Sequence, residues 1–193
     1  MHLVNFCVIL TKEREGFAVD IVKRMTEANR YYVAHGNDSL RRDTAENGQH
    51  PYAVVICCSD SRVIPEQIFH AQIGDLFVIR VAGNVLDRHQ IGSVEYAVSH
   101  LGCKLVLMLG HTGCGAVGAA LKGEADGHIS FITQDIQNAI GMDRDPDTAC
   151  RLNVAHGVKI LREAFLSEPD PFDVEIKGAV YDIKTGAVEW LEL

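Results

Sequence analysis

Side chains that can bind a metal are concentrated in two short segments of the chain. Cys58 is followed by Asp60 and Arg62 in the segment CSDSR, and His111 comes three positions before Cys114 in the segment GHTGCG. Thiolate and imidazole are common ligands of Zn²⁺ in proteins, and catalytic zinc sites have three protein ligands and one open position. We therefore predict a catalytic zinc site made by Cys58, His111 and Cys114. For Cys58 taken alone, the alternative is a small buried hydrophobic residue at the end of a strand.

Asp60 and Arg62 are close enough to Cys58 in the sequence to act at the same site. Because side chains alternate along an extended segment, both can point the same way. Arg62 would then hold one carboxylate oxygen of Asp60 while the other oxygen faces water at the metal. An isolated Asp-x-Arg pair is more typical of a surface ion pair with little effect on stability. The neighbouring zinc ligand favours a catalytic pair.

The glycines around Cys114 raise a second possibility. Gly113, Gly115 and Gly118 match the G-x-G-x-x-G pattern that binds dinucleotide phosphates at the N-terminus of a helix. That fold also needs an acidic residue at the end of the next strand, about twenty residues further on. Here Asp135 lies in a segment, SFITQDIQNAI, that has helical character. We therefore interpret the glycines as permitting a tight turn around the metal, and expect a side chain at Gly115 to displace Cys114.

The elements that must position these residues follow an α/β pattern. Short runs rich in Val, Ile and Leu are typical of strands buried in a parallel sheet, and they alternate with helical segments. The predicted strands are residues 52–57, 76–81, 105–109 and 174–181, and the clearest helices are 17–33, 91–100 and 148–165. The polar segment 35–49 is expected to lead into the first strand. We predict a mostly parallel central sheet flanked by helices, with a C-terminal hairpin turning at residues 182–186 and an N-terminal helical arm.

This order of elements brings the reactive segments to one edge of the sheet. The first and third strands run into the two metal-binding segments, and the second runs into RVAGN at residues 80–84. Ligands of open α/β sheets bind at the carboxyl ends of the strands. The three loops are therefore expected to face one crevice.

The composition fits a single globular domain over residues 1–193, in which residues 1–34 form the arm. The chain has 193 residues, 47% of them hydrophobic, and a formal net charge of −8. Its 18 basic residues are dispersed, which argues against nucleic-acid binding. The apolar run 3–10 is too short to span a bilayer and has no basic residues before it, so we expect a buried strand or arm and no membrane association. The six cysteines then indicate a reducing compartment, the cytoplasm, with free or metal-bound thiols.

Taken together, the motifs resemble those of the β-class carbonic anhydrases. CSDSRV at residues 58–63, EYAV at 95–98 and GHTGCGAV at 110–117 carry the resemblance, which extends from the segment MTEANRYYV to the terminal hairpin. It implies a zinc lyase that interconverts carbon dioxide with bicarbonate and a proton. The implied zinc ligands are Cys58, His111 and Cys114, and the implied catalytic pair, Asp60 and Arg62, orients a zinc-bound hydroxide toward the substrate.

The resemblance also implies which residues contact the substrate. The expected set is Gln49, Phe77, Ala82, Tyr96 and Gly115. Its apolar members would form a pocket for an uncharged substrate, and Gln49 would donate a hydrogen bond. His100 matches a position that some members use as a proton relay, and the alternative is a helix-end histidine without a role.

The resemblance further implies an assembly of several copies. The apolar face of helix 17–33 would be buried on a second copy, giving a homodimer or a larger homo-oligomer with a shared site. Two other functions stay open at this point. One is a carbon disulfide or carbonyl sulfide hydrolase on the same scaffold, and the other is a non-catalytic zinc module in which Asp60 closes the site.

Overall fold

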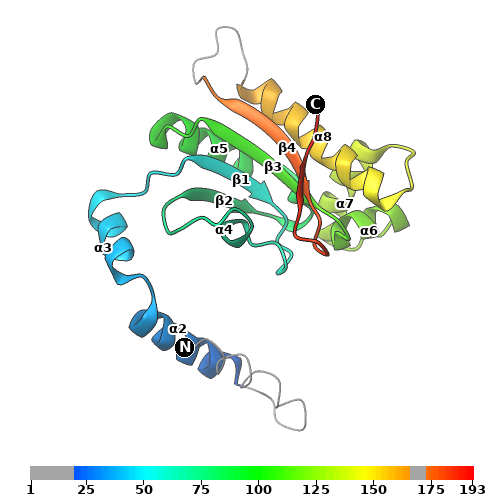
Figure 1. The fold of residues 1–193 in the computed structure, drawn as a ribbon. Coiled ribbons are helices and arrows are strands. Elements are labelled where there is room, and N and C mark those ends of the chain that lie inside the picture. The colour runs from blue at the N-terminus through cyan, green and yellow to red at the C-terminus, as the bar shows by residue number, and fades with distance from the viewer. Residues whose placement is uncertain (1–19, 166–172) are drawn as a thin grey trace. The chain divides into compact units, whose positions relative to one another are not determined.

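The computed structural model describes residues 20–165 and 173–193 (Figure 1). The chain divides into two compact units, residues 1–42 and 43–193. The predicted strand or arm at residues 3–10 lies outside the described residues. Within the described ranges, no helix is both long enough and apolar enough to cross a membrane.

The first unit is built around helix α2, Ile21–His35. The side chain of Asp20 caps this helix by accepting a hydrogen bond from the Lys23 backbone N–H at 3.0 Å. The predicted helix covered residues 17–33, of which residues 17–19 lie outside the described ranges. Its apolar side chains are exposed, with 74% of Val22 and 68% of Met25 accessible in the single chain.

Helix α3, Asp38–Asn47, spans the boundary between the units and lies in the polar segment 35–49, for which no helix was predicted. The Asn37 side chain accepts a hydrogen bond from the Leu40 backbone N–H, which satisfies one donor at the start of the helix. Ion pairs from Asp38 to Arg41 and Arg42 then join residues that are neighbours on the helix surface. The helix is stabilised by local polar contacts and has no apolar stripe in its sequence.

The second unit contains one five-stranded sheet in the order β2-β1-β3-β4-β5. The strands are β1 Ala53–Cys57, β2 Leu76–Arg80, β3 Leu105–His111, β4 Glu175–Tyr181 and β5 Val188–Trp190. All neighbouring pairs are parallel except β4 and β5, which form the predicted antiparallel hairpin. The mostly parallel sheet predicted from the apolar runs is confirmed.

Helices cover the sheet and close its core. They are α4 Pro65–Ile68, η1 Ala82–Asn84, α5 Arg88–Leu101, α6 Gly115–Lys122, α7 Ile129–Ile140 and α8 Pro146–Phe165. Side chains alternate along β1, so that Val54 and Ile56 pack with α5 and α8 while Val55 and Cys57 pack on the face that also holds Val63. Burying each such aliphatic side chain contributes about 1.5–3 kcal/mol. The central strands β1 and β3 are therefore rigid supports for whatever follows them.

Candidate metal centre

The three predicted metal ligands stand at the carboxyl ends of the two central strands. Cys58 directly follows β1, His111 is the last residue of β3, and Cys114 is the N-cap residue of α6. Because β1 and β3 are hydrogen-bonded neighbours, their ends are adjacent. One ligand atom from each residue lies within 4.8 Å of the other two, and all three side chains are buried. Among the described residues, this is the group of His, Cys and acidic side chains that could hold a metal ion.

The imidazole of His111 is arranged to coordinate a metal. Its Nδ1 lies 3.0 Å from the Thr112 carbonyl oxygen, which can only accept, so Nδ1 carries the proton and Nε2 has a free lone pair. Nε2 is buried and has no hydrogen-bond partner. A buried acceptor without a partner is costly, and a metal ion would supply the missing contact.

The two sulfur atoms have a spacing that suits zinc. The Sγ atoms of Cys58 and Cys114 are 4.0 Å apart. Two Zn–S bonds of about 2.3 Å at a tetrahedral angle would separate the sulfurs by about 3.8 Å. The donor set of two sulfurs and one nitrogen therefore fits Zn²⁺.

The same two thiols share one negative charge in the protein by itself. Hydrogen bonding from the Cys114 thiol stabilises the Cys58 thiolate and lowers the pKa of Cys58, in spite of burial. The contact with Cys58, together with burial, raises the pKa of Cys114. The neighbouring Cys57 points to the opposite face, where burial raises the pKa of its thiol to about 12. Of the two adjacent cysteines, only Cys58 is prepared to act as an anionic ligand.

Asp60 and Arg62 form a two-point ion pair beside the ligands. Arg62 Nε donates to Asp60 Oδ1 at 2.9 Å and Nη2 donates to Oδ2 at 2.7 Å. This corrects the expectation that Arg62 would hold only one carboxylate oxygen, because the planar guanidinium matches both. Hydrogen bonds from Arg62 hold the pKa of Asp60 well below its usual range. Asp60 is not part of the ligand group and is paired with Arg62 instead.

Arg80 holds the backbone of the first metal-binding segment, a role that was not predicted from the sequence. From the end of β2, its Nη2 donates to the Asp60 carbonyl oxygen at 2.7 Å and its Nε donates to the Cys58 carbonyl oxygen at 3.3 Å. The feature of the sequence that could have predicted this role is an arginine at the end of the strand next to the one that leads into Cys58. The contacts fix the turn that carries both the ligand and the carboxylate.

The predicted substrate-binding residues are less closely grouped than the ligands. The rings of Phe77 and Tyr96 are 6.3 Å apart, and Tyr96 stacks on His100 at 5.0 Å. Tyr96 is 48% exposed, and Gln49 lies on an exposed segment before β1. Ala82 begins η1 and is half-buried. Phe77, Tyr96 and His100 therefore form a row of neighbouring rings.

The glycines of the second metal-binding segment meet the expectation of a tight turn at Gly113 but not at Gly115. Gly115 is the first residue of α6, does not have a positive φ, and has open space where a Cβ would stand. The expectation that a side chain there would displace Cys114 is therefore not supported by its surroundings. Gly113 has a φ of 63°, and a Cβ on Gly110 would lie 2.5 Å from Val154 Cγ2. These two positions are the ones that require glycine.

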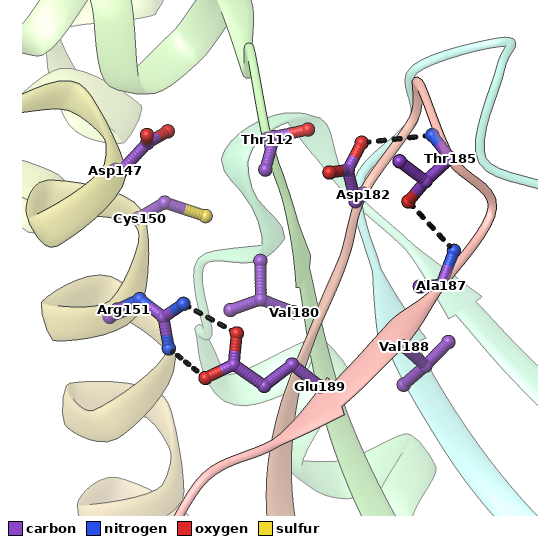
Figure 2. Close-up of a pocket in the computed structure, with 10 residues that line it drawn as sticks. All are labelled: Thr112, Asp147, Cys150, Arg151, Val180, Asp182, Thr185, Ala187, Val188 and Glu189. Carbon is purple, nitrogen blue, oxygen red and sulfur yellow. Dashed lines mark hydrogen bonds and ion pairs between the residues drawn. The ribbon is translucent and has the colours of Figure 1, made fainter.

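A separate cavity of about 280 Å³ lies between α8 and the β4–β5 hairpin (Figure 2). None of the three metal ligands lines it. Arg151 on α8 and Glu189 on β5 form a two-point ion pair at its edge, with distances of 2.7 and 2.6 Å. Cys150 connects it to the metal centre, since its Sγ donates to the His111 carbonyl oxygen at 3.1 Å.

Comparisons with known proteins agree with this geometry. The carbonic anhydrase family model matches residues 53–188. Carbonic anhydrase 2 of Mycobacterium tuberculosis is 46% identical over 112 residues, which cover 55% of this chain and 54% of that protein. A carbonic anhydrase of Mycolicibacterium smegmatis is 35% identical over 159 residues, covering 79% of this chain and 70% of that protein. The chain therefore spans about half the length of the M. tuberculosis relative.

A solved structure extends the likeness to the fold. The structure comes from a description of two tetrameric β-carbonic anhydrases of Sordaria macrospora, and it aligns with a TM-score of 0.71 and 27% identity. The alignment covers 90% of this chain and 96% of that one. The family match includes both metal-binding segments, strands β1 to β4 and the first residue of β5. On fold, motifs and relatives together, the chain belongs to the β-class carbonic anhydrase family.

Proposed function

We propose that this chain catalyses the reversible hydration of carbon dioxide to bicarbonate and a proton, with Zn²⁺ held by Cys58, His111 and Cys114. The observation that carries the proposal is the buried Cys-His-Cys group beside an ion-paired aspartate, in a chain of the carbonic anhydrase family. When bound, Zn²⁺ supplies the Lewis acidity that makes water a nucleophile at neutral pH.

Asp60 orients the attacking oxygen in this proposal. Because Arg62 holds both carboxylate oxygens, the carboxylate has a fixed plane, and the lowered pKa of Asp60 keeps it ionised at neutral pH. An ionised carboxylate is an acceptor only. It would take the hydrogen bond of the nucleophile's O–H and so direct a lone pair at the substrate carbon.

The remaining site residues bind the substrate and move the proton. Phe77, Tyr96 and Ala82 would provide apolar contacts to carbon dioxide, and Gln49 would donate a hydrogen bond to one of its oxygens. Gly115 leaves space at the start of α6. His100 is a candidate for passing the released proton to buffer, because its Nδ1 lies 2.8 Å from the Ser99 hydroxyl at the exposed end of α5.

We also propose that the active form is a homo-oligomer in a reducing compartment, the cytoplasm. The exposed apolar side chains of α2 and the exposed Tyr96 support a second copy. The described relatives include tetrameric β-carbonic anhydrases. Five cysteines in the described ranges have free thiols, as expected where disulfides do not persist.

A stopped-flow hydration assay on protein of measured zinc content tests the proposal. We expect hydration of carbon dioxide to exceed turnover of carbonyl sulfide and carbon disulfide under matched conditions. Faster turnover of either sulfur compound would support the hydrolase alternative. Full zinc occupancy with no hydration at any pH would support the non-catalytic zinc module instead.

A further inference from the structure

Asn153 is a buried polar side chain whose partner lies in another part of the fold. It stands in the middle of α8 and is 5% exposed. Its Nδ2 donates a hydrogen bond to the Gly83 carbonyl oxygen at 2.8 Å. Because leaving a buried amide without its partner is costly, this bond constrains both groups. It joins α8 to η1, the short turn that follows β2.

Gly83 is in direct contact with a predicted metal ligand. Its backbone N–H donates to the Cys58 Sγ at 3.3 Å. Its φ is 69°, in the left-handed region, and an added Cβ would lie 2.8 Å from Ile136 Cδ1. The next residue, Asn84, also has a positive φ, of 44°. Two such residues in succession are uncommon, so this turn needs partners that hold it in place.

We propose that Asn153 is a positioning residue of the metal centre. By holding the Gly83 carbonyl, it keeps the Gly83 N–H directed at the sulfur of Cys58. An N–H···S hydrogen bond withdraws electron density from a thiolate and fixes its position, and such outer contacts tune a metal site. The inference rests on the zinc ligands of the proposed function and adds a residue that does not touch the metal.

Simple packing is the competing explanation, because α8 also lies against β3. Val154 packs so close to Gly110 that only glycine fits there, and Cys150 donates to the His111 carbonyl. A change on α8 could therefore disturb the metal through β3. Val158 is a suitable control, since it is 1% exposed on the same helix and lies near Gly178 in β4. Val158→Ala should lower stability without changing the Gly83 turn.

The test compares Asn153→Leu, Asn153→Gln and Val158→Ala in zinc-loaded and cobalt-loaded protein. Leu has the same number and branching of side-chain heavy atoms as Asn but no donor, so the Gly83 N–H is no longer held at the sulfur and the thiolate becomes more electron-rich. The sulfur-to-cobalt charge-transfer band should move to longer wavelength, and zinc affinity measured against a chelator should fall by about 10–100-fold. Asn153→Gln keeps the amide and should lose less affinity. Val158→Ala should keep the wild-type band and affinity at a lower melting temperature.

Two results would overturn the assignment. One is a wild-type band and wild-type zinc affinity in Asn153→Leu. The other is an equal loss of affinity in Val158→Ala, which would indicate packing alone. If Asn153→Leu does not fold, Asn153→Ser removes the direct bond with less crowding, and an unchanged band there also overturns it. Wild-type protein that binds neither metal would instead refute the zinc site of the proposed function.

Discussion

The metal centre and the expected carbon dioxide pocket differ in how much of each site one chain completes. Cys58, His111 and Cys114 are 5%, 0% and 8% exposed, and each lies at the end of a central strand or the start of a helix. Tyr96 is 48% exposed, and Gln49 lies on an exposed segment. Hydrogen bonds between β1 and β3 align the metal ligands within one chain. The aromatic ring of Tyr96, in contrast, stays partly exposed in the single chain. One chain brings the metal ligands together by itself, and in the proposed function the substrate pocket would be completed by a second copy.

Removing any one metal ligand should abolish zinc binding, which is the largest effect that we expect. Cys58→Ser, His111→Ala and Cys114→Ser should each lose stoichiometric zinc and hydration activity, because two protein ligands do not hold the ion well. Cys57→Ser and Cys103→Ser are matched controls, since both thiols are buried outside the ligand group. Elemental analysis of dialysed protein measures the outcome. Stoichiometric zinc in Cys114→Ser would remove that residue from the site.

Changing Asp60 should separate chemistry from metal binding. Asp60→Asn keeps the size of the side chain but loses the charge that Arg62 holds. Because Asp60 is not one of the metal ligands, zinc content should stay at the wild-type level. Hydration should slow by about 10²–10⁴-fold, the range for a positioned acid–base group. Asp182→Asn changes a carboxylate in the terminal hairpin that accepts from the Lys184 N–H, and it should leave the rate unchanged. A near-native rate in Asp60→Asn would exclude this mechanism.

Stripping zinc should measure how far the metal supports the sheet around it. A ligand that binds only the folded state stabilises it by about 4 kcal/mol when its free concentration is a thousand times its Kd. For a unit of this size, that corresponds to a fall of about 8–16 °C in melting temperature after chelation. Millimolar NAD, NADP or FAD should give no shift. A saturable shift with a nucleotide, together with indifference to chelation, would restore the dinucleotide interpretation of the glycines.

Charged substitutions on α2 should disrupt the assembly of copies without changing the zinc content. The double substitution of Val22→Glu and Met25→Glu places two carboxylates among exposed apolar side chains, and it should reduce the mass in solution to that of one copy. Zinc content should not change. Arg24→Glu changes the charge equally on another side of the helix, at 100° per residue, and should leave the assembly intact. Light scattering that finds only single copies of active wild-type protein would refute the role of α2.

The parts of the fold that could be predicted from the sequence are those with a local signal. The apolar runs of β1 to β4 identify strands, although β1 and β3 are buried more completely than β2 and β4. Gly186, with a φ of 79°, supports the predicted hairpin turn. Helix α3 was missed because its local polar contacts replace the apolar stripe on which the prediction depended. The order of residue types after each strand was enough to suggest one set of ligands at one edge of the sheet.

Residue type and spacing alone determined which side chains could bind zinc and which strands would carry them. Only the tertiary structure decided the contacts between distant segments. In the folded chain, Arg62 binds both carboxylate oxygens of Asp60, and the position too crowded for a side chain is Gly110 rather than Gly115. Asn153 donates a hydrogen bond to the carbonyl oxygen of Gly83, which is next to Cys58 in space. The physical reason is that hydrogen-bond partners and close contacts of this kind depend on how helices pack on the sheet, and no periodicity within a single segment encodes that packing.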